Sequence, residues 1–168
     1  IKNNLESIDE ITKKWDISIH ERIEMYKKAI DLFVASDEKL AAYQLLIKTL
    51  KLLEDDTELI MANQFLVTQA ITIGLQHPKV AQFDVLYNLP AVKAQKEAKT
   101  NEKLFELLHI FTFEDLAEYT KWESNNKQFL ESQNIESNVC RHKMMYLSFC
   151  SQAMKDNVIS YDNLAKIM

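Results

Sequence analysis

Hydrophobic residues recur along most of this chain at spacings of three and four, the period of an α-helix that buries one face. The first clear stripe steps by 4, 3, 4 and 3 along the chain and consists of Ile19, Ile23, Tyr26, Ile30 and Phe33. Ser18 directly precedes it and can cap a helix, and Glu21 three residues later completes a capping box. The pattern therefore predicts a helix that begins just after Ser18.

A second helix is predicted from Ser36, as its cap, to about Leu53. Asp37 and Glu38 would lie in its first turn, where the helix dipole favours acidic side chains. Its expected inner face is broad and contains Leu40, Tyr43, Leu45, Leu46, Ile47, Leu50, Leu52 and Leu53.

A third helix is predicted over residues 59–75, after an acidic turn at residues 54–57 that would cap it. This segment is apolar nearly all round, which is typical of a helix packed between neighbours. We expect Gly74 and then His77 and Pro78 to end it.

Beyond Pro78 the predicted helices are shorter. Residues 80–90 form a short apolar helix broken by Pro90, and residues 93–99 are polar and expected at the surface. A very apolar helix over residues 104–111 is expected to share a core with the segment before Pro90, because such short helices are not stable alone.

The last third of the chain is also predicted to be helical. Thr112 can cap a helix that bends at Asn125 and Asn126. A long helix over residues 135–155 follows, and Ser160 can cap the start of another. The expected inner face of the long helix contains Val139, Met144, Leu147, Cys150 and Met154.

Helices of similar length joined by short turns must pack antiparallel. About two helices per 35–40 residues is the rhythm of tetratricopeptide or HEAT repeats, although a plain helical bundle has the same periodicity. A single Gly and two Pro in 168 residues exclude glycine-rich phosphate loops and hairpin-rich β folds. The sequence thus predicts an all-α fold.

The net charge, the length of the apolar runs and the ends of the sequence narrow the class of protein further. With 20 basic and 25 acidic residues the net charge is −5, which disfavours a dedicated nucleic-acid surface. No apolar run reaches the length that spans a membrane. The chain opens with Ile1 and ends within a helical pattern at Met168, so we expect it to be a fragment.

Cys140 and Cys150 are the two cysteines, and both fall on the predicted helix over residues 135–155. Ten residues of helix rise about 15 Å, which is too far for a disulfide. We interpret both as reduced, buried thiols of an intracellular protein.

The sequence contains only weak candidates for a catalytic or metal-binding site. A zinc-protease helix needs His at positions i and i+4, but Glu24 stands four residues after His20. Cys140 and His142 are two apart on a helix and point in nearly opposite directions. His109 lies within an apolar run, where a half-buried histidine bonded at a helix end is favoured over a catalytic base.

The remaining ionisable and large side chains also have structural interpretations. The pairs Asp55-Asp56 and Glu114-Asp115 fall at predicted helix starts, where capping explains them. We interpret Trp15 and Trp122 as packing anchors and the methionines, Met144, Met145 and Met154, as core fillers. We therefore expect no catalytic, cofactor-binding or metal site and no cofactor; partner-binding residues are not assigned.

Residues 83–119 carry a family resemblance. They contain Phe83, Asp84, Leu86, Leu89, Pro90 and Val92, then Leu107, Leu108, Ile110 and Phe111, then Leu116 and Tyr119. This pattern resembles the hallmark segment of PCI domains, helical modules of the proteasome lid, the COP signalosome and eukaryotic translation initiation factor 3. Residues 42–50 and 125–132 resemble the initiation factor members most.

The resemblance implies a right-handed helical-repeat superhelix followed by a winged helix. It divides the chain into repeats (1–78), the helical core of the PCI domain (79–158) and the start of a largely missing winged helix (159–168). It also implies a non-enzymatic, cytoplasmic scaffold of initiation factor 3 that supports complex assembly and mRNA recruitment to the small ribosomal subunit. A PCI scaffold of the COP signalosome is the alternative.

The implied partners are other PCI and MPN subunits of the same complex and, through it, the small ribosomal subunit. We expect no membrane contact and no direct nucleic-acid binding in this part of the protein.

Overall fold

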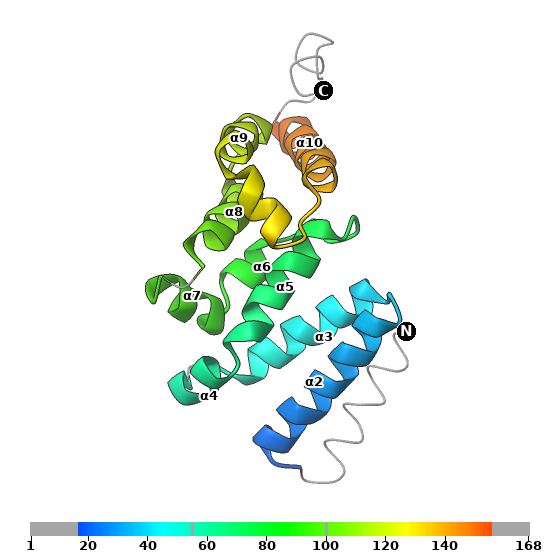
Figure 1. Ribbon diagram of the computed structural model, residues 1–168, viewed down its shortest axis with the longest axis vertical. Helices are drawn as coiled ribbons and strands as arrows, with labels where there is room; N and C mark the ends of the chain where they lie inside the picture. The colour runs from blue at the N-terminus through cyan, green and yellow to red at the C-terminus, as the bar shows by residue number, and fades with distance from the viewer. Residues whose placement is uncertain (1–16, 55, 100, 156–168) are drawn as a thin grey trace.

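The computed structural model describes residues 17–54, 56–99 and 101–155, and throughout these residues the regular structure is helical (Figure 1). The all-α prediction is thereby confirmed. The helices are α2 (Ile19–Ala35), α3 (Lys39–Leu52), α4 (Thr57–Ala62), α5 (Gln64–Gln76), α6 (Asp84–Tyr87), α7 (Pro90–Glu97), α8 (Glu102–Phe113), α9 (Leu116–Ser132) and α10 (Ser137–Lys155).

The helices are arranged in succession along the long axis of the molecule (Figure 1). Helices α2 and α3 pack together at one end, and α9 and α10 pack together at the other. Helix α5 lies in the middle and contacts α3, α7, α8 and α10. This arrangement fits a helical-repeat fold, in which each helix packs mainly against its neighbours.

One hydrophobic core connects the two ends of the described chain, from Ile23 in α2 to Met144 in α10. Its middle section confirms the predicted shared core, because Phe83 and Phe111 meet edge to face with ring centroids 5.5 Å apart. Leu86, Leu89, Leu104 and Leu107 are buried in the same cluster.

The predicted start of α2 is confirmed in detail. The backbone N–H of Glu21 donates to the Ser18 hydroxyl at 3.3 Å, and the backbone N–H of Ser18 donates to the Glu21 carboxylate at 3.1 Å. Both bonds of the capping box are therefore present.

The predicted start of α3 is wrong. Ser36 is the C-terminal cap of α2, where its N–H donates to the carbonyl of Leu32. Helix α3 begins only at Lys39, and Glu38 precedes it without a side-chain cap. Asp37 is in the left-handed region at φ 58°, so residues 36–38 form the turn between the two helices.

The single helix predicted over residues 59–75 is in fact two. The turn before it does cap α4, since Asp56 accepts the N–H of Leu59 at 3.0 Å. The break comes at Asn63, whose φ is −119° and whose side chain donates to the carbonyl of Leu59 at 2.8 Å. A side-chain amide that competes with the backbone favours such an interruption.

Gly74 does not end α5, as the sequence suggested, but lies inside it. The helix continues to Gln76 and is capped by His77. The glycine is required by packing, because a Cβ built on it would lie 2.9 Å from the Tyr43 ring of α3.

Two predictions between residues 78 and 100 also need correction. Pro90 opens α7 at its first position, where a missing N–H costs little, instead of breaking a helix. Residues 93–97 belong to that helix and are mostly exposed, but Gln95 is buried and donates to the carbonyl of Gln64 at 3.2 Å.

Thr112 is not a cap either. It lies within α8, and its hydroxyl donates to the carbonyl of Leu108 at 2.7 Å. Asp115 caps α9 instead, by accepting the N–H groups of Ala117 and Glu118. The predicted bend is confirmed at Asn126, whose φ of −129° marks a kink within α9.

The long helix α10 is confirmed, and its inner face is partly the one predicted, since Met144 is buried and Leu147 packs against the core. Cys140, Lys143 and Met144 are buried, whereas Cys150 is exposed and Met154 is 89% exposed. In the C-terminal half of α10, the predicted inner face therefore lies partly on the exposed side of the helix. Trp15, Asp55 and Ser160, and with them the predicted start of a winged helix, lie outside the described residues.

Candidate partner-binding surface

Two residues of the incomplete zinc-protease pattern on α2 make local contacts at the protein surface. Glu24 pairs with Lys27 at 2.7 Å, and Glu21 serves the capping box. Both contacts lower the pKa of the glutamate concerned, through hydrogen bonding to the carboxylate. In the described ranges, no three His, Cys, Asp or Glu side chains lie close enough to hold a metal ion.

The two cysteines differ in environment. Burial raises the pKa of the Cys140 thiol to about 12, so it is uncharged at neutral pH. His142 is exposed on α10, and Cys150 is a free thiol at the surface. Cys140 is buried and His142 is exposed, so the two point apart as their spacing predicted, whereas the expectation of a buried Cys150 is wrong.

His109 has neighbours that the sequence did not indicate. Its Nδ1 lies 3.3 Å from the Tyr87 hydroxyl, and its Nε2 lies 3.7 Å from a carboxylate oxygen of Glu114. The Tyr87 and Phe113 rings lie beside the imidazole, with centroids 6.0 and 5.0 Å away. The side chain of His109 is 45% exposed, so it lies at the rim of a surface and not in a closed pocket.

That surface is an open groove of about 740 Å³ formed by α8, the start of α9 and the end of α7, here called the α8–α9 groove. Its apolar lining comes from Phe105, Ile110 and Trp122. Four glutamates lie around these side chains: Glu102, Glu106, Glu114 and Glu118. Lys96, in the last turn of α7, and Lys99, just after that helix, also line it.

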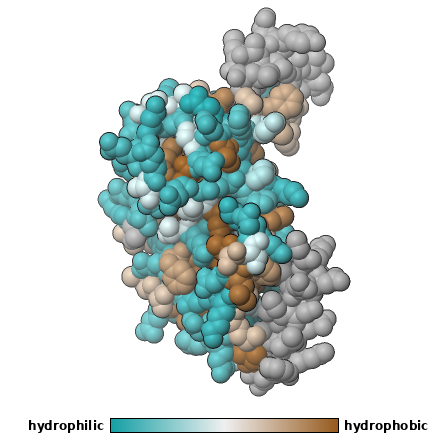
Figure 2. Space-filling view, turned by 45° about the vertical axis from the view of Figure 1, so that its right-hand side comes forward, coloured by the Kyte–Doolittle hydropathy of each residue, from teal (hydrophilic) through white to brown (hydrophobic). Residues whose placement is uncertain are grey.

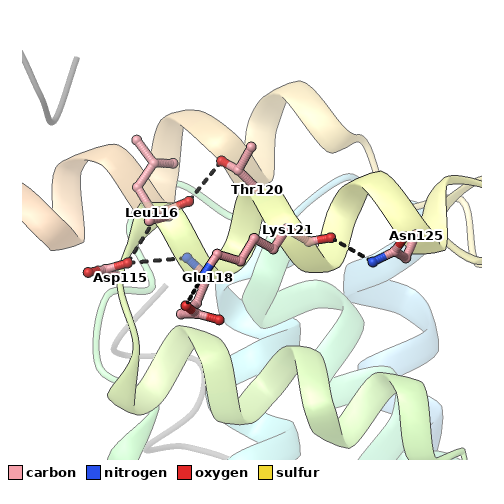
Figure 3. Close-up of polar contacts among 7 residues, drawn as sticks. Asp115, Leu116, Glu118, Thr120, Lys121 and Asn125 are labelled. Atoms are coloured by element: carbon pink, nitrogen blue, oxygen red, sulfur yellow. Dashed lines mark hydrogen bonds and ion pairs between the residues drawn. The ribbon is translucent and has the colours of Figure 1, made fainter.

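Local contacts hold the groove side chains in place. The indole N–H of Trp122 donates to Glu106 at 3.0 Å, which joins α9 to α8. Lys96 donates to the Tyr87 hydroxyl at 2.6 Å and lies over that ring. Glu118 lies on the side of α9 that faces α8 and pairs with Lys121 at 2.5 Å (Figure 3).

A second cluster joins α9 to α10 around a buried carboxylate. Glu123 accepts a hydrogen bond from Ser137 and pairs with Arg141 at 2.5 Å. The Tyr119 hydroxyl donates to the carbonyl of Ser137, and burial raises the pKa of Tyr119. These residues are already partnered, so the cluster stabilises the helix pair and is not an open site.

Hydrophobic residues are exposed elsewhere, but in separate patches. Most of the face seen in Figure 2 is hydrophilic, with a few hydrophobic patches. On α10, Tyr146 is 67% exposed and Phe149 40%. The α8–α9 groove differs from the depression beside Tyr146 in the four glutamates that line it.

Comparison with known proteins shows similarity to one kind of translation factor over essentially the whole chain. The chain is 28% identical over 174 residues to eukaryotic translation initiation factor 3 subunit M of Pyricularia oryzae, and 26% identical over 173 residues to that of Dictyostelium discoideum. It is 25% identical over 166 residues to the Homo sapiens protein. No protein-family model matches the chain.

These alignments cover 98–100% of the chain but only 40–42% of the relatives, so the chain spans about two fifths of the length of the curated relatives it matches. The resemblance of residues 42–50 and 125–132 pointed to subunit M in particular, with subunit 7 of the COP signalosome as the alternative. The comparisons support a relationship to subunit M and do not favour the alternative.

Proposed function

We propose that this chain is part of a non-enzymatic scaffold subunit of the eukaryotic translation initiation factor 3 complex. The observation that carries the proposal is the similarity to subunit M proteins from a fungus, an amoeba and an animal over the whole chain. In this role the protein supports assembly of the complex and mRNA recruitment to the small ribosomal subunit.

The arrangement of the helices supports the proposed scaffold function. Its helices lie in succession, so they offer long side faces to partners (Figure 1). Each of the two acidic pairs noted in the sequence contributes a helix cap: Asp56 caps α4 and Asp115 caps α9. In the part that the structure describes, no helix has the length and apolar character needed to cross a membrane.

We further propose the division of the chain that the PCI resemblance implies, with repeats over residues 1–78, the helical core over 79–158 and the start of a winged helix at 159–168. The repeats form a right-handed superhelix. The protein acts in the cytoplasm, with other PCI and MPN subunits as direct partners and the small ribosomal subunit as an indirect one.

The test is affinity purification of the tagged full-length protein from cells, followed by mass spectrometry. The proposal expects the other initiation factor 3 subunits and small-subunit ribosomal proteins in near-stoichiometric amounts. A Leu107→Asp variant, which disrupts the core, is the matched negative control. Recovery of cullins and signalosome subunits in place of initiation factors would reject the proposal.

A further inference from the structure

We infer that the α8–α9 groove binds a basic segment of a partner protein, with an arginine or lysine side chain between the groove glutamates and apolar residues beside it. The inference rests on the proposed scaffold function, because it names the chemistry of one partner surface. It is argued from the charge and apolar character of the groove.

The charge around the groove is negative. Four glutamates and two lysines line it. Lys96 is already engaged by the Tyr87 hydroxyl at 2.6 Å, which directs its ammonium group to that ring. A groove with this excess of carboxylates attracts a cationic segment and repels an anionic one.

The carboxylates remain accessible to a partner. The Glu118 carboxylate pairs with Lys121 in a surface pair whose side chains are 47% and 71% exposed. Exposed pairs of this kind are weak, so an incoming guanidinium can displace Lys121. Glu102 lies at the first position of α8 and is exposed.

The apolar residues of the groove determine which side chains of a bound partner segment fit there. Trp122 is half-buried and offers contact area to hydrophobic side chains, whereas Phe105 and Ile110 are only 5% and 8% exposed and form the floor of the groove. Trp122 and Glu106 are held together by a 3.0 Å hydrogen bond, so an aromatic ring and a carboxylate are presented side by side. Arginine suits such a site, because its planar cation pairs with carboxylates and stacks on aromatic rings.

Single-stranded RNA is the competing occupant, since aromatic rings and lysines also occur in RNA-binding grooves. The glutamates argue against it, because each would face the phosphate backbone with like charge. The test therefore includes an RNA probe.

The experiment measures binding of three labelled probes to the full-length protein by fluorescence anisotropy. The probes are a 14-residue peptide of Leu, Ala and Arg, the same peptide with Glu in place of Arg, and a 14-nucleotide oligouridylate. The groove variant is Glu102→Gln with Glu118→Gln. The matched control is Glu97→Gln with Glu131→Gln, which removes the same charge from exposed positions outside the groove.

The arginine peptide should bind most tightly, and its dissociation constant should rise about 5-fold in the groove variant and less than about 2-fold in the control. Fluorine NMR on protein labelled with 5-fluorotryptophan, with the Trp122 signal assigned through Trp122→Phe, should show that this signal moves on binding. Equal effects of the two variants, tighter binding of the acidic peptide or RNA, or an unmoved Trp122 signal would overturn the inference.

Failure here is distinguishable from failure of the scaffold proposal. A full-length protein that co-purifies with initiation factor 3 subunits but fails the peptide test contradicts only the groove. Groove-specific peptide binding without those subunits contradicts only the proposed complex.

Discussion

The side chain of Lys143 in α10 donates a hydrogen bond to the carbonyl of Gly74 in α5, at 2.5 Å and across 69 positions of sequence. A second bond reaches the carbonyl of Leu75 at 3.1 Å, and the ammonium group lies 5.2 Å from the centre of the Phe83 ring. Carbonyls in the last turn of a helix lack backbone partners. A buried lysine therefore satisfies the end of the central helix and ties α10 to it.

This arrangement predicts a pH-dependent contribution to stability. Burial lowers the pKa of Lys143 from 10.5 to about 8. Between these values the unfolded chain holds a proton on this group that the folded chain has released, so the free energy of unfolding rises with pH. Relative to a Lys143→Met variant, we expect a rise of at most about 3 kcal/mol between pH 8 and 10.5.

Urea melts of both proteins at pH 8, 9 and 10 measure this difference. Burial of Cys140, which raises its pKa from 9.0 to about 12, acts in the opposite direction above pH 9, and Lys143 interacts with that thiol, so both proteins are compared in a Cys140→Ser background. Lys79→Met, at an exposed position, is the control and should leave the pH dependence unchanged. A difference between wild type and Lys143→Met that stays constant with pH would contradict the prediction.

Gly74→Ala should destabilise the protein although alanine is the better helix former. The added Cβ would lie 2.9 Å from Tyr43 Cε2, and Tyr43 is only 8% exposed, so the ring cannot move freely. We expect a loss of about 1–2 kcal/mol, because overpacking outweighs a propensity gain of about 1 kcal/mol. In a Tyr43→Leu background the loss should largely disappear in urea melts; an equal loss in both backgrounds would exclude this contact as the cause.

Leu107→Asp should unfold the protein or reduce its free energy of unfolding by more than about 4 kcal/mol, because a charge would be placed in the core. Leu107 is fully buried in α8. Lys96 is exposed, as the sequence predicted, but its bond to Tyr87 makes Lys93→Asp the cleaner surface control. Lys93→Asp should change stability by no more than about 0.5 kcal/mol. Similar melts for both variants would show that α8 is misplaced.

The sequence predicted best where one local rule decided the structure. The capping box of Ser18 and Glu21 is confirmed, and so is most of the predicted stripe, with Ile23, Tyr26 and Ile30 buried and Phe33 packed against the core. Ile19, at the first position of α2, is the exception and is 41% exposed. The break at Asn63 was missed and Ser36 was assigned to the wrong helix, because capping residues occur at both ends of helices and in their interiors. Choosing among these positions depends on packing, which the pattern does not contain.

The candidate surface could be predicted only in part. Trp122 was expected to be a packing anchor, and its contacts with Glu106 and Phe129 agree with that. The proximity of His109 to Tyr87 and the approach of Lys143 to Gly74 join residues on different helices. No spacing rule relates such residues, so only the folded arrangement shows them.

The two thiols should react very differently. Cys150 is exposed, whereas Cys140 is fully buried with a pKa raised to about 12. A thiol reagent should therefore label Cys150 quickly in the native protein and Cys140 only when the core opens. Mass spectrometry of labelled peptides, with Cys150→Ser as the control, measures both rates. Fast native labelling of Cys140 would contradict the burial of α10.

The Glu123–Arg141 pair predicts that the two single substitutions differ in their cost to stability. The Glu123 side chain is 5% exposed, whereas that of Arg141 is 50% exposed. Arg141→Met leaves a buried carboxylate with Ser137 alone, and we expect a loss of about 3 kcal/mol. Glu123→Leu leaves a cation that can turn to solvent, so its cost should be smaller.

The double variant, Glu123→Leu with Arg141→Met, should be more stable than Arg141→Met alone, because it removes the buried charge together with its partner. Urea melts of the two single variants and the double variant complete a double-mutant cycle that isolates the interaction between the two side chains. Glu118→Leu with Lys121→Met, an exposed pair on the same helix, is the control and should show a coupling below about 0.5 kcal/mol. If the losses at Glu123 and Arg141 simply add, the carboxylate is hydrated in the folded protein and does not depend on Arg141.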